Sequence, residues 1–316
     1  MSASWVGGTV RARALARRRL GAAGARALAT TGDLAGARAA LARTPYAGRT
    51  VADPGGLAGL AGLQHQVAAT LLWHLRVLAG WLPRDGAQAM RVLAGGFEAA
   101  NLDEHLRHLD GRPAGPTYRL GTLQTAWTRL AASTGPEQVR QVLSASLWGD
   151  PGASDPWSVH MGLRLGWAQR VVDGVPGADH WARGAAALLL LREAFLSGRR
   201  PPDRLAARSA DLLGAGFVQA LAGPARSPAE LAPLLPADAR WAVEDVDDPQ
   251  DLWRAEVAWW HRVERDAFGM LRTPSFSSTP VIGAVAVLAV DAWRVRAALG
   301  TAARGGSALE VFDALV

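Results

Sequence analysis

The stretch "LAGLAGLQHQVAATLLWHLRVLAGWL", residues 57–82, decides the fold class of this 316-residue chain. Its apolar residues recur at spacings of three and four, the periodicity of one buried stripe on an α-helix. The stripe consists of Leu57, Leu60, Leu63, Val67, Leu71, Leu75, Leu78 and Leu82. His65 and His74 flank it, and we expect both at its boundary or on the surface rather than as ligands.

Similar helix signals recur along the whole chain, whereas alternating strand patterns are nearly missing. Four pairs place a capping residue before a proline and predict helix starts: Asp155-Pro156, Ser227-Pro228, Asp248-Pro249 and Thr279-Pro280. Glycines at 111, 149, 198, 223 and 300 predict helix ends. The sequence therefore predicts an all-α protein.

Tryptophan is abundant, with 13 residues. Several fall on predicted helical stripes, namely Trp73, Trp127, Trp167, Trp181, Trp253 and Trp293. Such rings can also form stacking platforms for bases or sugars. Because they lie inside predicted helices rather than in loops beside polar partners, we expect them to pack in the core.

Cysteine is absent, which excludes disulfides, thiolate metal sites and cysteine nucleophiles. All basic residues are arginine, and the net charge is +6. The densest basic cluster is "RARALARRRL", residues 11–20. An arginine-rich solvated helix face is the favoured interpretation, and contact with nucleic acid or anionic lipid is the alternative.

The sequence leaves the compartment open but fits a cytosolic protein. "MSASWVGGTVRARA" carries arginines where a secretory signal has an apolar core. The longest apolar run, "PVIGAVAVLAV" at 280–290, is ended by Asp291 and is shorter than the roughly 18 residues that cross a bilayer. These features leave room for a partner that is attached to a membrane.

No catalytic motif is present. A phosphate-binding loop of the G-x-x-x-x-G-K-[ST] type needs lysine, which the chain lacks, and there is no G-x-S-x-G or H-E-x-x-H. We therefore expect no catalytic residues and no cofactor.

The segment "NLDEHLRHLDG", residues 101–111, raises the question of a metal site through His105 and His108. On a helix, Leu102, Leu106 and Leu109 share one face, while the histidines share another with Asn101. A carboxylate-bridged metal bundle needs a Glu-x-x-His on each of two helices. The chain offers no second half, so we expect a structural helix and no metal.

Three segments form a weak repeat, "NLDEHLRHLDGR" (101–112), "LLLLREAFLSGR" (188–199) and "DAWRVRAALGTAARG" (291–305). Each has an arginine in an apolar helix end, followed by glycine and arginine. The spacing indicates three helical units, approximately 1–112, 113–200 and 201–316. Helix C-termini also attract arginine and glycine for dipole and capping reasons, which is the competing explanation.

Several stretches together resemble the central-stalk socket protein of V-type and A-type rotary ATPases, the family designated C or d. The opening "WVGGTVRARALARRRL" is followed by Leu41, Thr44 and Tyr46 in a Leu-x-x-Thr-x-Tyr helix end. "FEAANLDEHLRHLDGRP" is similar to the family's aromatic-x-x-x-Asn-Leu-x-x-x-x-Arg helix. "DLWRAEVAWWHRVERDAFGMLRTPSF" and "TPVIGAVAVLAVDAWRVRAALGTAARGG" resemble its two last long helices. The succession spans nearly the whole chain.

This resemblance implies a single funnel-shaped, all-α domain over 1–316, made of three pseudo-threefold-related units and without an active site. It implies a component of the central stalk that couples the soluble rotor axle to the membrane proteolipid ring and transmits torque for ion transport or ATP synthesis. The protein would contact the membrane only through that ring, and would not bind nucleic acid. From the repeat we expect Arg107, Arg192 and Arg294 to contact carboxylates on these partners.

Two other functions remain open. The chain could be a free-standing helical-repeat scaffold that has diverged from the rotary machine. It could also be a metalloprotein with histidine and carboxylate ligands.

Overall fold

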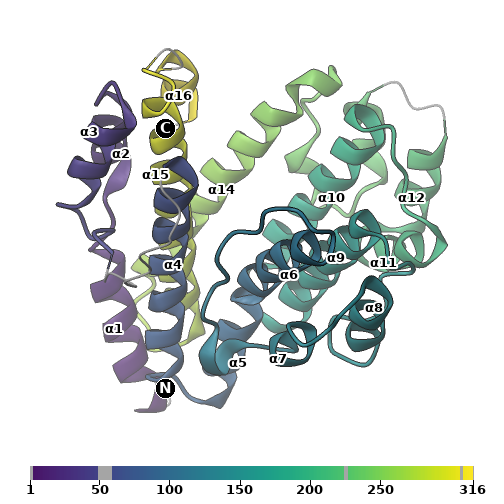
Figure 1. The fold of residues 1–316 in the computed structure, drawn as a ribbon, viewed down its shortest axis with the longest axis horizontal. Helices are drawn as coiled ribbons and strands as arrows, with labels where there is room; N and C mark the ends of the chain where they lie inside the picture. Colours follow the sequence, from purple (N-terminus) through teal and green to yellow (C-terminus); the bar gives the residue numbers. More distant parts are fainter. Residues whose placement is uncertain (1–2, 49–58, 224–226, 307–308, 316) are drawn as a thin grey trace. The chain divides into compact units, whose positions relative to one another are not determined.

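The computed structural model describes residues 3–48, 59–223, 227–306 and 309–315, and in these ranges every regular element is an α- or 3-10 helix (Figure 1). The predicted all-α class is confirmed. The chain divides into two compact units, Met1–Ala87 with Val263–Val316 (unit 1) and Gln88–Arg262 (unit 2). The boundaries fall inside α5 (Arg84–Leu93) and α14 (Leu252–Arg272). The three consecutive units expected from the repeat have other boundaries and stay a prediction.

Unit 1 is built around α15 (Ser278–Ala302), of which 18 of 25 residues are buried. Because its first half is apolar all round, this helix is stable only when neighbours cover every side. It contacts α1 (Val6–Ala16), α2 (Gly21–Ala29), α4 (Leu60–Ala79) and the shorter α3 (Leu34–Leu41) and α16 (Leu309–Leu315). The unit also contains η1 (Ala3–Trp5).

Helix α4 carries the stripe that the sequence predicted. Leu63, Val67, Leu75 and Leu78 are all buried, whereas Leu57 lies outside the described residues. The expectation for His74 was wrong, because its imidazole is only 6% exposed. Burial lowers the pKa of His74 to about 4, and the nearby Arg18 charge contributes in the same direction.

In unit 2, α9 (Pro156–Gly174) packs against α6 (Gly95–Leu109), α10 (Asp179–Leu196) and α11 (Asp203–Leu213). Gly95 and Gly96 let Trp167 lie directly on α6, because a Cβ at either position would come within 2.8 or 3.0 Å of the indole. The remaining elements are η2 (Gly121–Leu123), α7 (Trp127–Leu130), α8 (Pro136–Ser144), α12 (Ala215–Ala222), α13 (Pro228–Leu231), η3 (Ala232–Leu234), η4 (Arg240–Ala242) and η5 (Pro249–Asp251).

Most predicted helix boundaries are confirmed. Asp155 and Ser227 cap α9 and α13, and Asp248 caps η5, which leads into α14. Gly111 and Gly198 follow helix ends with positive φ. The predicted end at Gly300 was wrong, because α15 continues through it to Ala302, and α15 begins at Ser278, just before the expected Thr279-Pro280 start.

In unit 1, the turn that follows α3 ends at Tyr46, whose aromatic side chain is buried. The hydroxyl of Thr44 donates to the carbonyl of Leu41 (2.7 Å) and accepts from the backbone N–H of Tyr46 (3.1 Å). The Tyr46 hydroxyl then donates to Oδ2 of buried Asp291 on α15 (2.8 Å). Asp291 also accepts from the consecutive amides of Leu20 and Gly21 at the start of α2 (2.8 and 2.7 Å).

The turn after α8 in unit 2 has the same geometry. The Ser146 hydroxyl donates to the carbonyl of Leu143 (2.8 Å) and accepts from the N–H of Trp148 (3.2 Å). Trp148 Nε1 donates to Oε1 of buried Glu98 on α6 (2.9 Å). Glu98 also accepts from the consecutive amides of Thr125 and Ala126 before α7 (2.5 and 2.7 Å). We call residues 41–46 and 143–148 the two aromatic turns, and each is anchored by one buried carboxylate.

Candidate functional site

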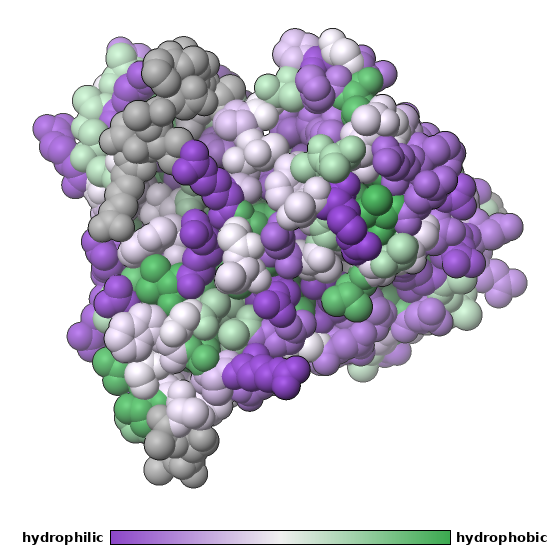
Figure 2. Space-filling model, turned by 60° about the horizontal axis from the view of Figure 1, so that its bottom comes forward, coloured by the Kyte–Doolittle hydropathy of each residue, from purple (hydrophilic) through white to green (hydrophobic). Residues whose placement is uncertain are grey.

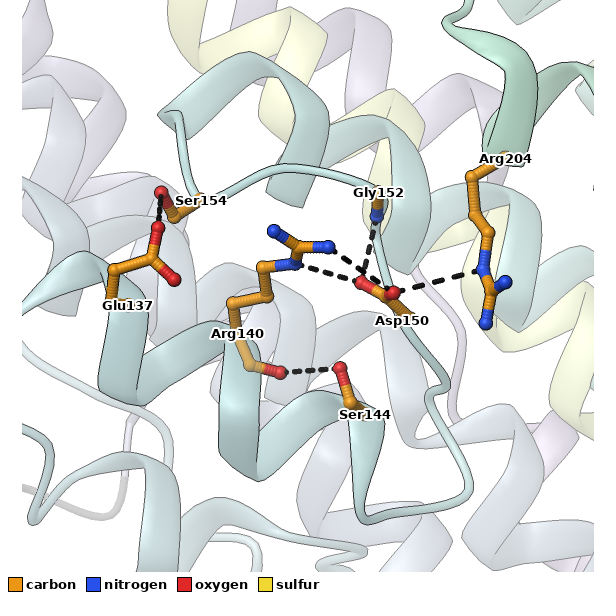
Figure 3. Close-up of polar contacts among 7 residues, drawn as sticks. All are labelled: Glu137, Arg140, Ser144, Asp150, Gly152, Ser154 and Arg204. Atoms are coloured by element: carbon orange, nitrogen blue, oxygen red, sulfur yellow. Dashed lines mark hydrogen bonds and ion pairs between the residues drawn. The ribbon is translucent and has the colours of Figure 1, made fainter.

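A surface ion-pair cluster in unit 2 surrounds Asp150, in the loop between α8 and α9 (Figure 3). Arg140 of α8 binds both carboxylate oxygens, from Nε to Oδ1 at 3.0 Å and from the terminal nitrogen to Oδ2 at 3.3 Å. Arg204 of α11 approaches Oδ2 at 3.7 Å. The Gly152 amide donates to Oδ1 at 2.9 Å. The cluster thereby ties the loop to two helices.

The local sequence explains how Asp150 is placed. Gly149, with φ of +75°, directs the chain away from the aromatic turn in a backbone conformation that other residues rarely adopt. A Cβ at Gly149 would also lie 2.4 Å from a terminal nitrogen of Arg208. Arg208 itself donates to the carbonyl of Gly162 at 3.0 Å. Gly149 therefore provides both the turn and the space for this third arginine.

An open depression of about 470 Å³ lies beside Asp150. It is lined by Glu137, Arg140, Gln141, Ser144, Ala145 and Asp150. The hydroxyl of Ser144 donates to the carbonyl of Arg140 (2.8 Å), and that of Ser154 donates to Oε1 of Glu137 (2.6 Å). Both serine protons are therefore held by neighbours, as Figure 3 shows.

The electrostatics of this depression favour binding over acid–base catalysis. The hydrogen bond from Arg140, and then the Gly152 amide, lower the pKa of Asp150 to about 2. A carboxylate that remains ionised near neutral pH is a poor general acid or base, since proton exchange needs a pKa close to the working pH. The same pair raises the pKa of Arg140. The cluster can hold a polar partner, and it lacks an activated nucleophile.

The three arginines predicted as partner contacts have different surroundings. Arg107 is half exposed and pairs with Glu104 at 3.3 Å, and Arg192 is more exposed, with Glu256 at 3.7 Å. Arg294 is only 4% exposed and binds both oxygens of Glu264 within unit 1. Its guanidinium therefore has an internal carboxylate partner. A role in partner binding stays a prediction for all three.

The two histidines of the 101–111 segment diverge on α6. His105 lies 3.0 Å from the carbonyl of Ser133 and edge-on to Trp127, whereas His108 is exposed. Asp103 of the same helix pairs with His160 of α9 at 3.1 Å. In the described residues, no group of three histidine or acidic side chains is arranged to hold a metal ion.

His160 has a partner at each of its ring nitrogens. Arg164 donates to its Nε2 at 2.7 Å, and because arginine only donates, Nδ1 carries the proton given to Asp103. Both ring nitrogens are thus occupied by α6 and α9. This Asp-His-Arg chain joins two helices and leaves no imidazole nitrogen for a substrate.

Sequence reasoning missed the roles of Glu98 and Asp291, two buried carboxylates that each accept three hydrogen bonds. A usable signal was present: Leu-x-x-Thr-x-Tyr at 41–46 and Leu-x-x-Ser-x-Trp at 143–148 share one pattern. The carboxylates that anchor the two turns also share a spacing: Glu98 lies three positions before Asn101, and Asp291 lies three positions before Arg294. This correspondence pairs Arg294 with Asn101, and not with Arg107 as the sequence repeat had assumed.

The comparisons with known proteins add no relative. No protein-family model matches the sequence, and no curated protein matches it. No helix in the described part of the chain is long and apolar enough to cross a membrane.

Proposed function

We propose that this chain is a non-catalytic coupling protein of a V- or A-type rotary ATPase. In this role it links the soluble rotor axle to the membrane proteolipid ring and transmits torque between them. The observation that carries the proposal is the duplicated arrangement of an aromatic turn on a buried carboxylate, at Asp291 and at Glu98.

The duplication fits a mechanical role because it repeats a rigid connection rather than a reactive group. In each copy, one carboxylate joins a long helix, the start of a short helix and a buried aromatic ring. Buried polar networks in which every group is satisfied hold one arrangement of the surrounding core. Close-packed cores also deform little under load.

The residues that carry the family resemblance contribute to these connections. Leu41, Thr44 and Tyr46 form the first aromatic turn. Asn101 is fully buried on α6. Its side-chain nitrogen donates to the Tyr118 carbonyl (2.9 Å), and its side-chain oxygen accepts from the Tyr118 backbone N–H (2.5 Å). The resemblance therefore involves side chains that have defined structural tasks.

Co-purification tests this proposal directly. The tagged chain, co-expressed with the axle and proteolipid-ring proteins of a rotary ATPase from its own genome, should retain both at stoichiometric levels. The isolated chain should hydrolyse no ATP. A chain that remains alone in the presence of both sets of proteins would overturn the proposal and would favour the free-standing scaffold.

The metalloprotein alternative is tested separately. It requires stoichiometric iron, manganese or zinc in the purified protein, lost on combined His105→Ala and His108→Ala substitution. Elemental analysis of the unsubstituted chain and of this double variant decides that alternative whatever the co-purification shows.

A further inference from the structure

The outer face of α1 combines exposed apolar and basic side chains. Val6 is 40% exposed, Val10 is 56% exposed, and Trp81, just after α4, is 56% exposed. Arg11, Arg17 and Arg18 are exposed as well. We call these six residues the α1–Trp81 face. The end of α1 marked N in Figure 1 comes forward in Figure 2, where green and pale surface lies at the lower left.

Helical geometry explains how these residues are arranged on α1. At about 100° per residue, Val6 and Val10 fall within a narrow stripe that the C-cap residue Arg17 continues, and Arg11 lies further round, on the side where Trp81 packs. The buried side, with Ala12, Leu15 and Ala16, faces the core of unit 1. The exposed stripe is therefore a second apolar surface, which the core does not use.

Trp81 is positioned on this face by two contacts with α1. Its ring lies 3.4 Å from the place where Gly7 would carry a Cβ, and the Arg11 guanidinium lies over the ring at 5.9 Å from its centroid. The indole is thus held against α1 while more than half of it stays exposed. A large aromatic ring kept at the surface in this way is suited to contact with another apolar phase.

Positive charge predominates in the segment that carries this face. The first 32 residues contain six arginines and no acidic residue, and residues 1–87 contain 11 arginines and three acidic residues. Unit 2 is different, with 18 arginines and 20 acidic residues. Two other arginines of the same cluster have partners within unit 1: Arg13 donates to the Thr273 carbonyl, and the Arg19 guanidinium lies over the Phe268 ring. Arg11, Arg17 and Arg18 are exposed, and Arg18 also lies near enough to His74 to affect its pKa.

We propose that the α1–Trp81 face binds the surface of a bilayer that contains anionic phospholipids. Valine and tryptophan side chains next to arginines are the composition of helices that lie in the headgroup region, with the aromatic ring at the interface. Arginine stems reach from an apolar contact to the phosphates. This contact adds to the membrane attachment through the ring that the proposed function implies, and it does not depend on that function.

Lipid fits the face better than the other polyanions. A nucleic-acid backbone would pair with the arginines and leave Val6, Val10 and Trp81 uncovered. A bilayer covers both kinds of side chain, because its surface combines anionic headgroups with adjacent acyl chains and adapts to the shape of the protein.

Vesicle sedimentation with the full chain tests the proposal. Vesicles of phosphatidylcholine with about 30 mol% phosphatidylglycerol should bind the protein, and pure phosphatidylcholine vesicles should bind it far more weakly. Binding should decrease as salt rises above about 0.1 M. Trp81→Ala should lower the partition coefficient roughly tenfold, and combined Arg11→Gln, Arg17→Gln and Arg18→Gln roughly a hundredfold.

Unit 2 offers matched controls. Trp253 is 43% exposed and stacks with Arg254, as Trp81 does with Arg11, so Trp253→Ala should leave vesicle binding unchanged. Combined Arg112→Gln, Arg119→Gln and Arg129→Gln removes three exposed arginines and should have little effect. Melting temperatures verify that every variant is folded.

Three results would overturn the proposal: equal binding to both kinds of vesicle, wild-type binding by the folded Trp81 variant, or equal losses in the unit 2 controls. Salt-sensitive retention of DNA or polyglutamate without vesicle binding would also overturn it, in favour of another polyanion. Loss of vesicle binding while the axle and ring proteins still co-purify would leave the proposed function standing.

Discussion

Asp291 and Glu98 each connect two backbone amides to a buried aromatic side chain. Each is at most 2% exposed and accepts hydrogen bonds from two amides and one aromatic donor. A buried carboxylate is costly to desolvate, and here its hydrogen bonds offset that cost. Neither residue reaches the surface, so their importance is structural.

Removing one of these charges should destabilise the fold strongly. Asp291→Asn keeps the size of the side chain but turns an amide N–H₂ toward groups that donate, which leaves buried donors unsatisfied. We expect the free energy of unfolding to fall by about 2–4 kcal/mol, measured by urea denaturation. Glu98→Gln should act similarly in unit 2. Asp313→Asn, which removes an exposed pair with Arg26, should have a much smaller effect, and equal losses would contradict the assigned roles.

His74 should make the stability of unit 1 depend on pH. Its pKa is about 4 in the folded chain, through burial and then Arg18, against about 6.5 in the unfolded chain. As pH falls, His74 is therefore protonated first in the unfolded state. The contribution of neutral His74 to stability is complete above about pH 6.5 and is lost as pH falls toward 4. At pH 5 the loss should be about 2 kcal/mol relative to pH 7.

Comparison with His74→Gln isolates this effect, because the other titrating groups are common to both proteins. The difference in unfolding free energy between the two should change between pH 7 and pH 5. Arg18→Gln should raise the pKa of His74 in an NMR titration without restoring its ordinary value. Parallel pH profiles for wild type and His74→Gln would refute the prediction.

At the scale of the element, the close approach of α15 to α14 depends on one glycine. A Cβ on Gly283 would lie 2.7 Å from the Ala267 carbonyl oxygen and 2.8 Å from Met270 Cβ. Since the nearest of these is backbone, no side-chain rotation relieves the clash. The apolar composition of 280–290 explains why α15 is buried, and Gly283 explains how closely α14 packs on it.

Gly283→Ala should therefore destabilise the chain by about 1–3 kcal/mol in chemical denaturation, despite the better helix propensity of alanine. Gly300→Ala in the same helix is the matched control. Its Cβ would meet only the ends of Arg304 and Gln64, at 3.8 and 4.0 Å. This substitution should stabilise the chain by roughly 0.5–1 kcal/mol. Effects of the same sign at both positions would contradict the packing described.

The two aromatic turns should respond alike to substitution. Thr44→Ala and Ser146→Ala each remove a hydroxyl that donates to one backbone group and accepts from another. We expect each to cost about 1 kcal/mol in unfolding free energy. Thr44→Ser and Ser146→Thr preserve the hydroxyl and should recover most of the loss. A large effect at one turn and none at the other would argue against structural equivalence.

At the scale of the whole molecule, the chain forms unit 1 from its two ends and unit 2 from its middle. Segments 1–87 and 263–316 are far apart in sequence, yet α15 supplies the core on which α1, α2 and α4 pack. The excess positive charge belongs to unit 1, whereas unit 2 is nearly balanced. Folding of unit 1 therefore requires the C-terminal segment of the chain.

A charge introduced into the core of one unit should lower the hydrogen-exchange protection of that unit more than that of the other. Val287→Asp lies at the centre of α15, and Val159→Asp lies on α9; the valines are 1% and 0% exposed. Val287→Asp should reduce the protection of amides in α1, α2 and α4 more than in α6, α9 and α10. Val159→Asp should have the reverse pattern. A uniform loss in both variants would mean that the two units unfold as one.

Local signals predicted much of the fold. Side-chain caps before proline located three starts, because those interactions are complete within a few residues. Local signals failed at Gly300, through which α15 continues to Ala302, and at Trp253, which is exposed although it occupies an apolar helical position. For the site, sequence singled out Arg107, Arg192 and Arg294 but not the Asp150 cluster, whose members come from α8, a loop and α11.

The sequence by itself determined the helical class, the apolar stripe of α4, the apolar first half of α15 and the basic character of the first 87 residues. Each follows from composition or from a periodicity that one element contains. Only the tertiary structure decided that His74 and Arg294 are buried, that Asp291 and Glu98 anchor equivalent turns, and that Trp81 lies on α1. These depend on contacts between residues that are distant in sequence, such as Leu20 and Asp291, which are 271 positions apart, and no local pattern encodes such contacts.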